Sequence, residues 1–355
     1  MKIGYHWKVR DGDEKDLKGI LSLRKIVFGE LEEDKLEERF WRWEYEQGPY
    51  GKAFIYIVEE GGRCIGHLAD LPKQFSVNGK VVPGTFHLEL MVHPDYWRKG
   101  IFHEMEKYAV QHVKNENKLL MTACTVRQES INGLKKVGWK PVCQLPVLVF
   151  PIRFRGILNR YLHSQSLNFL VGGVTRFFYF LLYGLKRKKE TGGVEIEKVS
   201  QLDDSFDHFW QKALSLYSII GIRNRNYLTW RYLQHPTRNY TIYRAKKNGG
   251  MTGYIVLRKV ELLKFNSAVI VDLLALDDVT LSALVQRGIQ HSQQEGADLL
   301  GVIVPQVHFS YRLLRKMGFL PSLKTFLFLI YPHSNDDVLF SPGKWYANWG
   351  DTDVM

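Results

Sequence analysis

The alternation of hydrophobic and polar residues divides the chain into short strands and amphipathic helices that follow one another in mixed order. The first part of the chain predicts a strand at 4–10, a helix ending at about 28, a helix at 33–45, and strands at 53–58 and 64–69. Acidic residues from Asp11 to Asp16 would cap the first helix and favour its first turn. Gly61 and Gly62 permit the tight turn that joins the last two strands into a hairpin.

The stretch at residues 87–102 changes character along its length. It begins as an alternating apolar strand, turns, and becomes the helix 103–109. Gly100 stands at the crossing, where it lets the backbone bend and leaves backbone N–H groups unblocked. Those groups and the positive end of the helix favour phosphate, and Arg98 and Lys99 add two positive charges. The pattern fits a pyrophosphate site, and it also fits an ordinary turn with a solvated basic tip.

The second part of the chain repeats the first. At an offset of 187 residues the repeated features are Trp-x-Tyr-x-Gln-x-Pro at 43–49 and 230–236, and the hairpin glycines 66 and 253. At an offset of 180 they are Leu-Leu at 119 and 299, and the Ser-x-x-x-Leu-x-Lys-x-Gly segments at 130 and 310. Anchors in the same order with matched spacing predict a duplicated domain.

The copies differ in the interval that holds Gly100. In the second copy this interval reads 271–280, with no glycine, arginine or lysine and with several carboxylates. Acidic side chains would repel a pyrophosphate. We therefore expect one copy that can bind a cofactor through its pyrophosphate and one copy that has lost this site. The second copy would shape a substrate cleft or stabilise the first copy.

Composition narrows the class of protein. A length of 355 residues suits two domains of about 150 each. The 45% hydrophobic content excludes wholesale disorder, and the net charge of +12 favours an anionic partner such as nucleotide phosphates, nucleic acid or an acidic membrane. The three cysteines lack metal-ligand spacing and the first residues lack a signal segment, so we expect a reduced, cytoplasmic protein without a metal site.

The segment between the copies has a different texture. Residues 166–185 are strongly apolar and are followed at once by four basic residues. Arg176 in the apolar run argues against a transmembrane helix. A buried helical connector and a segment at 153–189 that lies on anionic lipid, at the inner membrane face, both fit. The aromatic tail at 336–355 is expected to pack onto the body of the protein.

Together these features resemble the GNAT superfamily of N-acetyltransferases. The coenzyme A loop of that family usually reads Gln/Arg-x-x-Gly-x-Gly/Ala, and residues 97–102 keep its middle glycine, with Trp97 and Phe102 at the outer positions. The resemblance covers about residues 4–148 and, more weakly, 194–332. It implies an α/β fold with two tandem GNAT-like domains, each a twisted mixed β-sheet flanked by helices.

The resemblance also implies a domain plan and a cofactor. The expected parts are an acetyltransferase domain at 1–150, a helical linker at 151–192, a degenerate GNAT-like domain at 193–335 and the tail at 336–355. Acetyl-coenzyme A is the expected co-substrate. The residues expected to hold it are the strand backbone at Met91 and Val92 and the loop residues Trp97, Arg98, Lys99, Gly100, Ile101 and Phe102.

The strand before the loop carries the expected catalytic residues. Because side chains alternate along a strand, Thr85, His87, Glu89 and Met91 are expected on one face. GNAT enzymes often place a glutamate on this strand as general base, so Glu89 is the first candidate and His87 the second. The alternative for Glu89 is an ion pair with a core arginine.

The group that protonates the departing thiolate is not evident. In the family it is often a tyrosine four residues before the glycine that corresponds to Gly138, and this chain has Leu134 there. Tyr108, His103 or the tail could substitute, and the terminal carboxylate at Met355 could serve as a base.

The expected function is acetyl transfer to a primary amine on a small molecule, possibly anionic, such as an amino sugar or nucleotide sugar in surface-polysaccharide metabolism. Nucleic acid is not the expected partner, because no recognised binding module appears. Two alternatives remain: an aminoacyl transferase of the FemAB type, and a GNAT-fold scaffold without catalysis.

Overall fold

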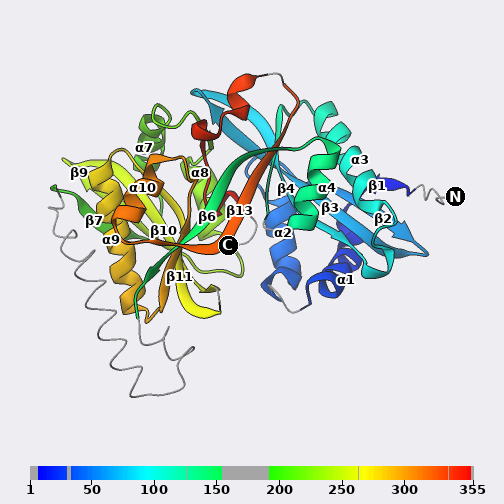
Figure 1. Cartoon of the computed structure of the whole chain (residues 1–355), viewed down its shortest axis with the longest axis horizontal. Helices are drawn as coiled ribbons and strands as arrows, with labels where there is room; N and C mark the ends of the chain where they lie inside the picture. The colour runs from blue at the N-terminus through cyan, green and yellow to red at the C-terminus, as the bar shows by residue number, and fades with distance from the viewer. Residues whose placement is uncertain are drawn as a thin grey trace, which may run out of the picture.

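The two halves of the chain fold with the same order of elements, except that the second half adds a strand between its first two helices and another at its end (Figure 1). The computed structural model describes residues 7–29, 33–125, 127–153, 192–262, 264–334 and 336–352. The first half contains β1 (Val9–Asp11), α1 (Leu17–Phe28), α2 (Glu38–Glu46), β2 (Phe54–Glu60), β3 (Arg63–Val77), β4 (Lys80–Val92), α3 (Ile101–Asn115), β5 (Leu120–Thr125), α4 (Gln128–Val137) and β6 (Lys140–Pro151). The second half contains β7 (Glu195–Val199), α7 (Ser205–Ala213), β8 (Ile219–Gly221), α8 (Arg225–Leu228), β9 (Thr241–Lys247), β10 (Gly250–Leu262), β11 (Phe265–Ala275), α9 (Asp278–Gln294), β12 (Leu299–Ile303), α10 (Phe309–Lys316), β13 (Leu320–Pro332) and β14 (Trp345–Tyr346). Two mixed α/β units, as predicted, are thus present.

One continuous sheet runs through both halves in the order β1-β2-β3-β4-β5-β13-β6-β12-β11-β10-β9-β7. Strand β6 closes the first half in sequence, yet it pairs with β12 of the second half. Strand β13 closes the second half and pairs with β5 of the first. The two strands also pair with each other and lie side by side at the centre of the molecule (Figure 1). Each half therefore completes the sheet of the other, and the boundary expected at residue 150 falls within this exchanged pair.

The hairpins form where glycine permits a left-handed backbone. Gly61 and Gly62 have φ values of 57° and 74° and join β2 to β3, which confirms the hairpin predicted there. Asn78 and Gly79, with φ of 51° and 80°, join β3 to β4 in the same way. Positive φ at both central residues matches the twist of the flanking strands, so the turn fixes the register of each hairpin.

Helices cover both faces of the sheet. Helices α1, α2, α7 and α8 pack over one face, and their apolar side chains share a single buried cluster that continues through both halves. On the other face α3 and α4 cover the first half, and α9 and α10 cover the second. The predicted helix at 33–45 is divided, because a short 3-10 turn at Glu33–Leu36 precedes α2.

The C-terminal tail packs onto the body, as expected. Strand β14 pairs in parallel with β8, and β8 in turn pairs with β3 of the first half. Trp345 and Trp349 are fully buried. The expected linker helix lies almost wholly outside the described residues, as does Met355. Within the described part of the chain, no helix has the length and apolar character needed to span a bilayer.

Candidate active site

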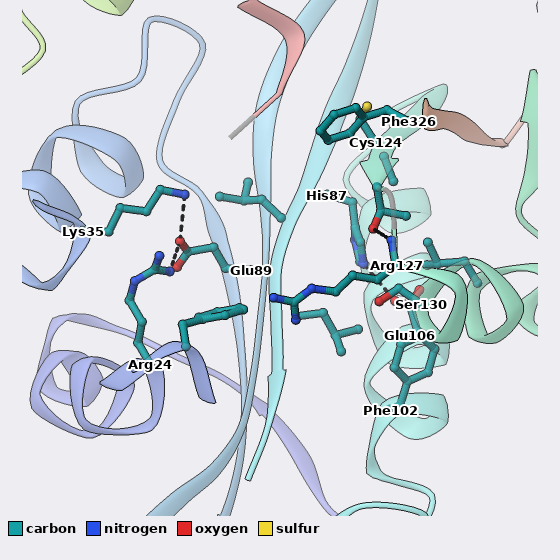
Figure 2. A pocket seen from close by; sticks show the side chains of 16 residues that line it. Arg24, Lys35, His87, Glu89, Phe102, Glu106, Cys124, Arg127, Ser130 and Phe326 are labelled. Atoms are coloured by element: carbon teal, nitrogen blue, oxygen red, sulfur yellow. Dashed lines mark hydrogen bonds and ion pairs between the residues drawn. The ribbon is translucent and has the colours of Figure 1, made fainter. Parts of the chain in front are cut away.

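Strands β4 and β5 separate partway along their length and open a cavity. They pair in parallel only from Gly84 with Leu120 to Phe86 with Thr122, among the described residues. On its other edge β5 pairs with β13 from Leu120 to Thr125. A cavity of about 370 Å³ lies in the opening, walled by side chains from β4, β5, α1, α3, α4 and β13 (Figure 2). Where two strands separate, some of their backbone N–H and C=O groups have no strand partner. These groups can form hydrogen bonds with a bound ligand.

A bulge in β4 turns Glu89 away from His87. The register between β3 and β4 shifts between His67 and Ala69, and Glu89 has a φ of 53°. The Nδ1–H of His67 donates to the Glu89 carbonyl oxygen at 3.0 Å and so holds the bulge. Glu89 consequently faces α1 and α2, whereas His87 faces α3 (Figure 2). The expectation that both side chains share one face is therefore wrong, because a bulge breaks the period-two alternation.

Glu89 is the anion of a buried cluster. Arg24 of α1 donates to it, Lys35 Nζ lies 3.4 Å from Oε1, and the Tyr45 hydroxyl donates to Oε2 at 2.9 Å. The Glu89 side chain is only 6% exposed. Burial alone would raise the pKa of Glu89, but the charges of Lys35 and Arg24 outweigh it and lower this pKa to about 2. The carboxylate is therefore ionised at any physiological pH.

His87 is held between two carboxylates. Its Nδ1 lies 3.1 Å from Asp70 Oδ1, and its Nε2 lies 2.9 Å from Glu106 Oε1. Trp139 Nε1 donates to the other oxygen of Glu106 at 3.1 Å. Burial lowers the pKa of His87, but Glu106 and Asp70 outweigh it and raise this pKa to about 10. A protonated imidazole has no lone pair to accept a proton, so this geometry does not suit His87 to the general-base role expected for it.

The predicted cofactor loop is held to the body of the protein at Lys99 and Ile101. Trp7 Nε1 donates to the Lys99 carbonyl oxygen at 2.8 Å, and Ile101 is buried in the core under α3. Gly100 has a φ of 90° and begins α3 without a capping side chain, and a Cβ placed there would meet nothing within 4 Å. The first turn of α3 therefore lies open at Gly100. Phe102, two residues after Gly100, lines the cavity.

The other residues expected to contact the cofactor differ in exposure and in backbone conformation. The Trp97 ring is exposed, and its Nε1 donates to the Val92 carbonyl oxygen at 2.8 Å. Arg98 has a φ of 62°, a left-handed backbone conformation. The Met91 side chain is fully buried, so only its backbone could contact a ligand.

Several residues that line the cavity were not among the expected site residues, because nothing in the sequence distinguishes them. Arg24, Lys35, Glu106 and Arg127 all line it. Leu134 also lines it, which places the usual tyrosine position at the cavity. Two suggested substitutes lie elsewhere.

Those two substitutes for the tyrosine are not on the cavity wall. Tyr108 donates to Asp11, the last residue of β1, and His103 is exposed on α3.

The second half has a counterpart of Glu89. Gly66 pairs with Val92 and Gly253 pairs with Ala275, which aligns Glu89 with Asp272, next to a register shift in each strand pair. Tyr232, the repeat partner of Tyr45, donates to Asp272 Oδ2 at 3.0 Å.

The surroundings of Asp272 are closed by the tail. Arg223 Nε lies 3.2 Å from Asp272 Oδ2, and Asn348 Nδ2 donates to Asp272 Oδ1 at 2.8 Å. Asp272 is fully buried. The helix after β11 is also closed, since Asp277 accepts from the Thr280 N–H at 2.7 Å, where the first half has Gly100.

Comparisons with known proteins agree with this fold. Residues 8–142 match the family described as "Acetyltransferase (GNAT) domain". No curated protein matches the sequence. The chain is similar to a GCN5-related N-acetyltransferase from Anabaena variabilis, with 12% identity, a TM-score of 0.65, and coverage of 92% of this chain and 72% of that one. It is similar to Saccharomyces cerevisiae N-myristoyltransferase with bound myristoyl-CoA and inhibitors (13%, TM-score 0.62, 94% and 82%). It is also similar to a tandem GNAT protein from the clavulanic acid biosynthesis pathway (13%, TM-score 0.56, 94% and 100%). The structural likenesses confirm the predicted GNAT fold.

Proposed function

We propose that the protein transfers an acyl group, acetyl in the first instance, from coenzyme A to a primary amine, because residues 8–142 match the GNAT acetyltransferase family. The observation that carries the proposal is the cavity between β4 and β5. It has Phe102 of the cofactor loop on its wall and the ionised Glu89 on the opposite side of the sheet opening. A donor thioester and an acceptor amine could therefore meet between them.

On the donor side, the loop offers a phosphate site. Gly100 leaves the first turn of α3 open, and helix N–H groups with the positive end of the helix dipole favour a pyrophosphate. Arg98 and Lys99 add positive charge, and Lys99 Nζ is placed 4.6 Å from the Tyr96 ring centroid. The pantetheine arm would then run along the open edge of β4 toward the cavity.

On the acceptor side, Glu89 would bind the amine. Transfer joins the amine nitrogen to the thioester carbon and breaks the carbon–sulfur bond, and an ammonium loses two protons, one to the thiol and one to solvent. A carboxylate with a pKa of about 2 accepts a hydrogen bond from the amine but does not keep the proton at neutral pH. Glu89 thus orients the amine, and water carries the proton away. Leu134 supplies no proton, so we assign the protonation of the thiolate to solvent.

The acyl chain could be longer than acetyl. Phe102, Leu134 and Phe326 give the cavity apolar walls, and one similar structure holds myristoyl-CoA. Acceptors in the class of amino sugars or nucleotide sugars suit the basic chain. We retain them as the first compounds to screen.

Calorimetric titration with acetyl-, octanoyl- and myristoyl-coenzyme A tests the proposal. Micromolar binding by the wild type should be lost in Gly100→Glu, which puts a negative charge at the open helix end. Gly100→Asn is the matched control, because asparagine tolerates positive φ and adds no charge. A folded wild type that binds none of the three would overturn the proposal and favour the scaffold or aminoacyl-transferase alternatives.

A further inference from the structure

Arg127 reaches across the mouth of the cavity. It is the residue before α4, and its side chain extends from the α4 side toward the side of Glu89 (Figure 2). Its guanidinium lies 5.0 Å from the ring centroid of Phe28, the last residue of α1. A guanidinium held over an aromatic ring has N–H groups that point outward in its own plane. These N–H groups remain available to a ligand. Arg127 therefore presents its donors to the cavity from a fixed place.

The Arg127 side chain has no carboxylate partner among the described residues. Arg24 also lies over the Phe28 ring, at 5.1 Å, so two guanidinium groups share one aromatic side chain. Arg24 and Lys35 contact Glu89. The other contacts of Arg127 are made by its backbone: its N–H donates to Thr125 Oγ1, and its carbonyl oxygen accepts from the Ile131 N–H. The Arg127 guanidinium thus keeps a positive charge that favours a bound anion.

We propose that Arg127 binds a carboxylate or phosphate group of the acceptor, so that the acceptor is an amine that also carries an anion. This inference rests on the proposed function. The amine would contact Glu89 and the anion would contact Arg127, on two sides of one cavity. A guanidinium presents paired N–H groups that match the oxygens of either anion, which lysine does not. The coenzyme phosphates have their own cations at Arg98 and Lys99.

Matched acceptor pairs separate this proposal from the proposed function. The pairs are glucosamine 6-phosphate with glucosamine, O-phosphoethanolamine with ethanolamine, and phenylalanine with phenylalaninamide. Calorimetric binding is measured for each in the presence of coenzyme A, and acyl transfer is measured where it occurs. In at least one pair the anionic member should bind about tenfold to a hundredfold more tightly than the neutral one.

Variants then assign the preference to the side chain. Arg127→Gln should abolish the preference and leave the Kd for acetyl-coenzyme A unchanged, and Arg127→Lys should keep part of it. Arg39→Gln, which removes a positive charge from an exposed residue that does not line the cavity, is the control. Equal binding of both members in every pair, or a preference that survives Arg127→Gln, would overturn the inference. A weaker Kd for acetyl-coenzyme A in Arg127→Gln would overturn it too, since Arg127 would then belong to the donor site. If the wild type itself does not bind acyl-coenzyme A, this result would instead refute the proposed function.

Discussion

Trp43 and Trp230 stack on each other where the two halves meet, with ring centroids 4.7 Å apart and planes inclined by 16°. The indole N–H of Trp43 donates to the Trp230 carbonyl oxygen at 3.1 Å, and that of Trp230 donates to the Trp43 carbonyl oxygen at 3.3 Å. The two residues hold the same place in the sequence repeat. Their reciprocal contacts relate the halves by a local two-fold axis.

The tryptophan pair should couple the stabilities of the halves. Trp43→Phe and Trp230→Phe each remove a donor and leave a buried carbonyl without it, at a cost of about 1–3 kcal/mol. Their contact should give a coupling energy of about 0.5–1.5 kcal/mol in a double-mutant cycle. Urea unfolding of the wild type, both single variants and the double variant measures it. Strictly additive effects would show that the stack does not join the halves energetically.

Glu89→Gln should separate stability from cofactor binding. It leaves Arg24 and Lys35 buried without their carboxylate, which should destabilise the fold by about 3–5 kcal/mol. If the variant folds, acyl-coenzyme A should still bind, while transfer to amines should fall at least tenfold. Tyr45→Phe, which removes only one hydrogen bond to the same carboxylate, is the milder comparison. Unchanged transfer in folded Glu89→Gln would remove Glu89 from the acceptor site.

The same carboxylate should contribute to acid stability. Its pKa falls from 4.5 in the unfolded chain to about 2 in the fold, so its stabilising effect is complete above about pH 4.5 and is lost as pH falls toward 2. The difference in unfolding free energy between wild type and Glu89→Gln should therefore shrink over that range. A difference that does not change between pH 5 and pH 3 would contradict the low pKa.

His87 should remain protonated at neutral pH. Its pKa rises from 6.5 to about 10, so its stabilising effect is complete below about pH 6.5 and disappears as pH rises through 10. Histidine NMR signals should show no titration of His87 between pH 5 and 8. The stability of the wild type relative to His87→Gln should fall between pH 7 and 10. A midpoint near 7 would return His87 to the list of candidate bases.

The tail should tolerate no side chain at Gly350. A Cβ there would lie 2.4 Å from the Tyr232 hydroxyl and 3.1 Å from Asp272, both buried. Gly350→Ala should destabilise the protein by about 1–3 kcal/mol through overpacking. Gly343→Ala is the matched control, since a Cβ at Gly343 meets nothing within 4 Å. Equal melting temperatures for the two variants would show that the tail is not tightly packed against Asp272.

The periodic features of the chain could be predicted from sequence, and the local irregularities could not. The hairpin at Gly61 and Gly62 and the loop at Gly100 follow from residue types that only certain backbone conformations favour. The bulge at Glu89 could not be predicted in this way, because no glycine or proline lies next to Glu89 in the sequence. One inserted residue was enough to put Glu89 and His87 on opposite faces.

An ion pair between Glu89 and a core arginine was one of the two expectations and is present, but which residues supply the cations could not be predicted. Arg24 and Lys35 come from a helix and a turn that the sequence presents as ordinary charged positions, and only the tertiary fold brings them to β4. Tyr45 could have been found, since the repeat pairs it with Tyr232 and the structure gives both the same role. The exchange of β6 and β13 had no signal either, because both strands satisfy the same alternating pattern in either sheet.

That exchange sets the order in which the protein can be completed during synthesis. When β5 leaves the ribosome, its partner β13 has not been made, and about 200 further residues take roughly 10–40 s to translate. Through that interval the first half has an uncovered strand edge, the kind of surface on which nascent chains associate wrongly. Strand β13 thus finishes the sheet that contains the cavity, so the site is formed only after Pro332 has been made.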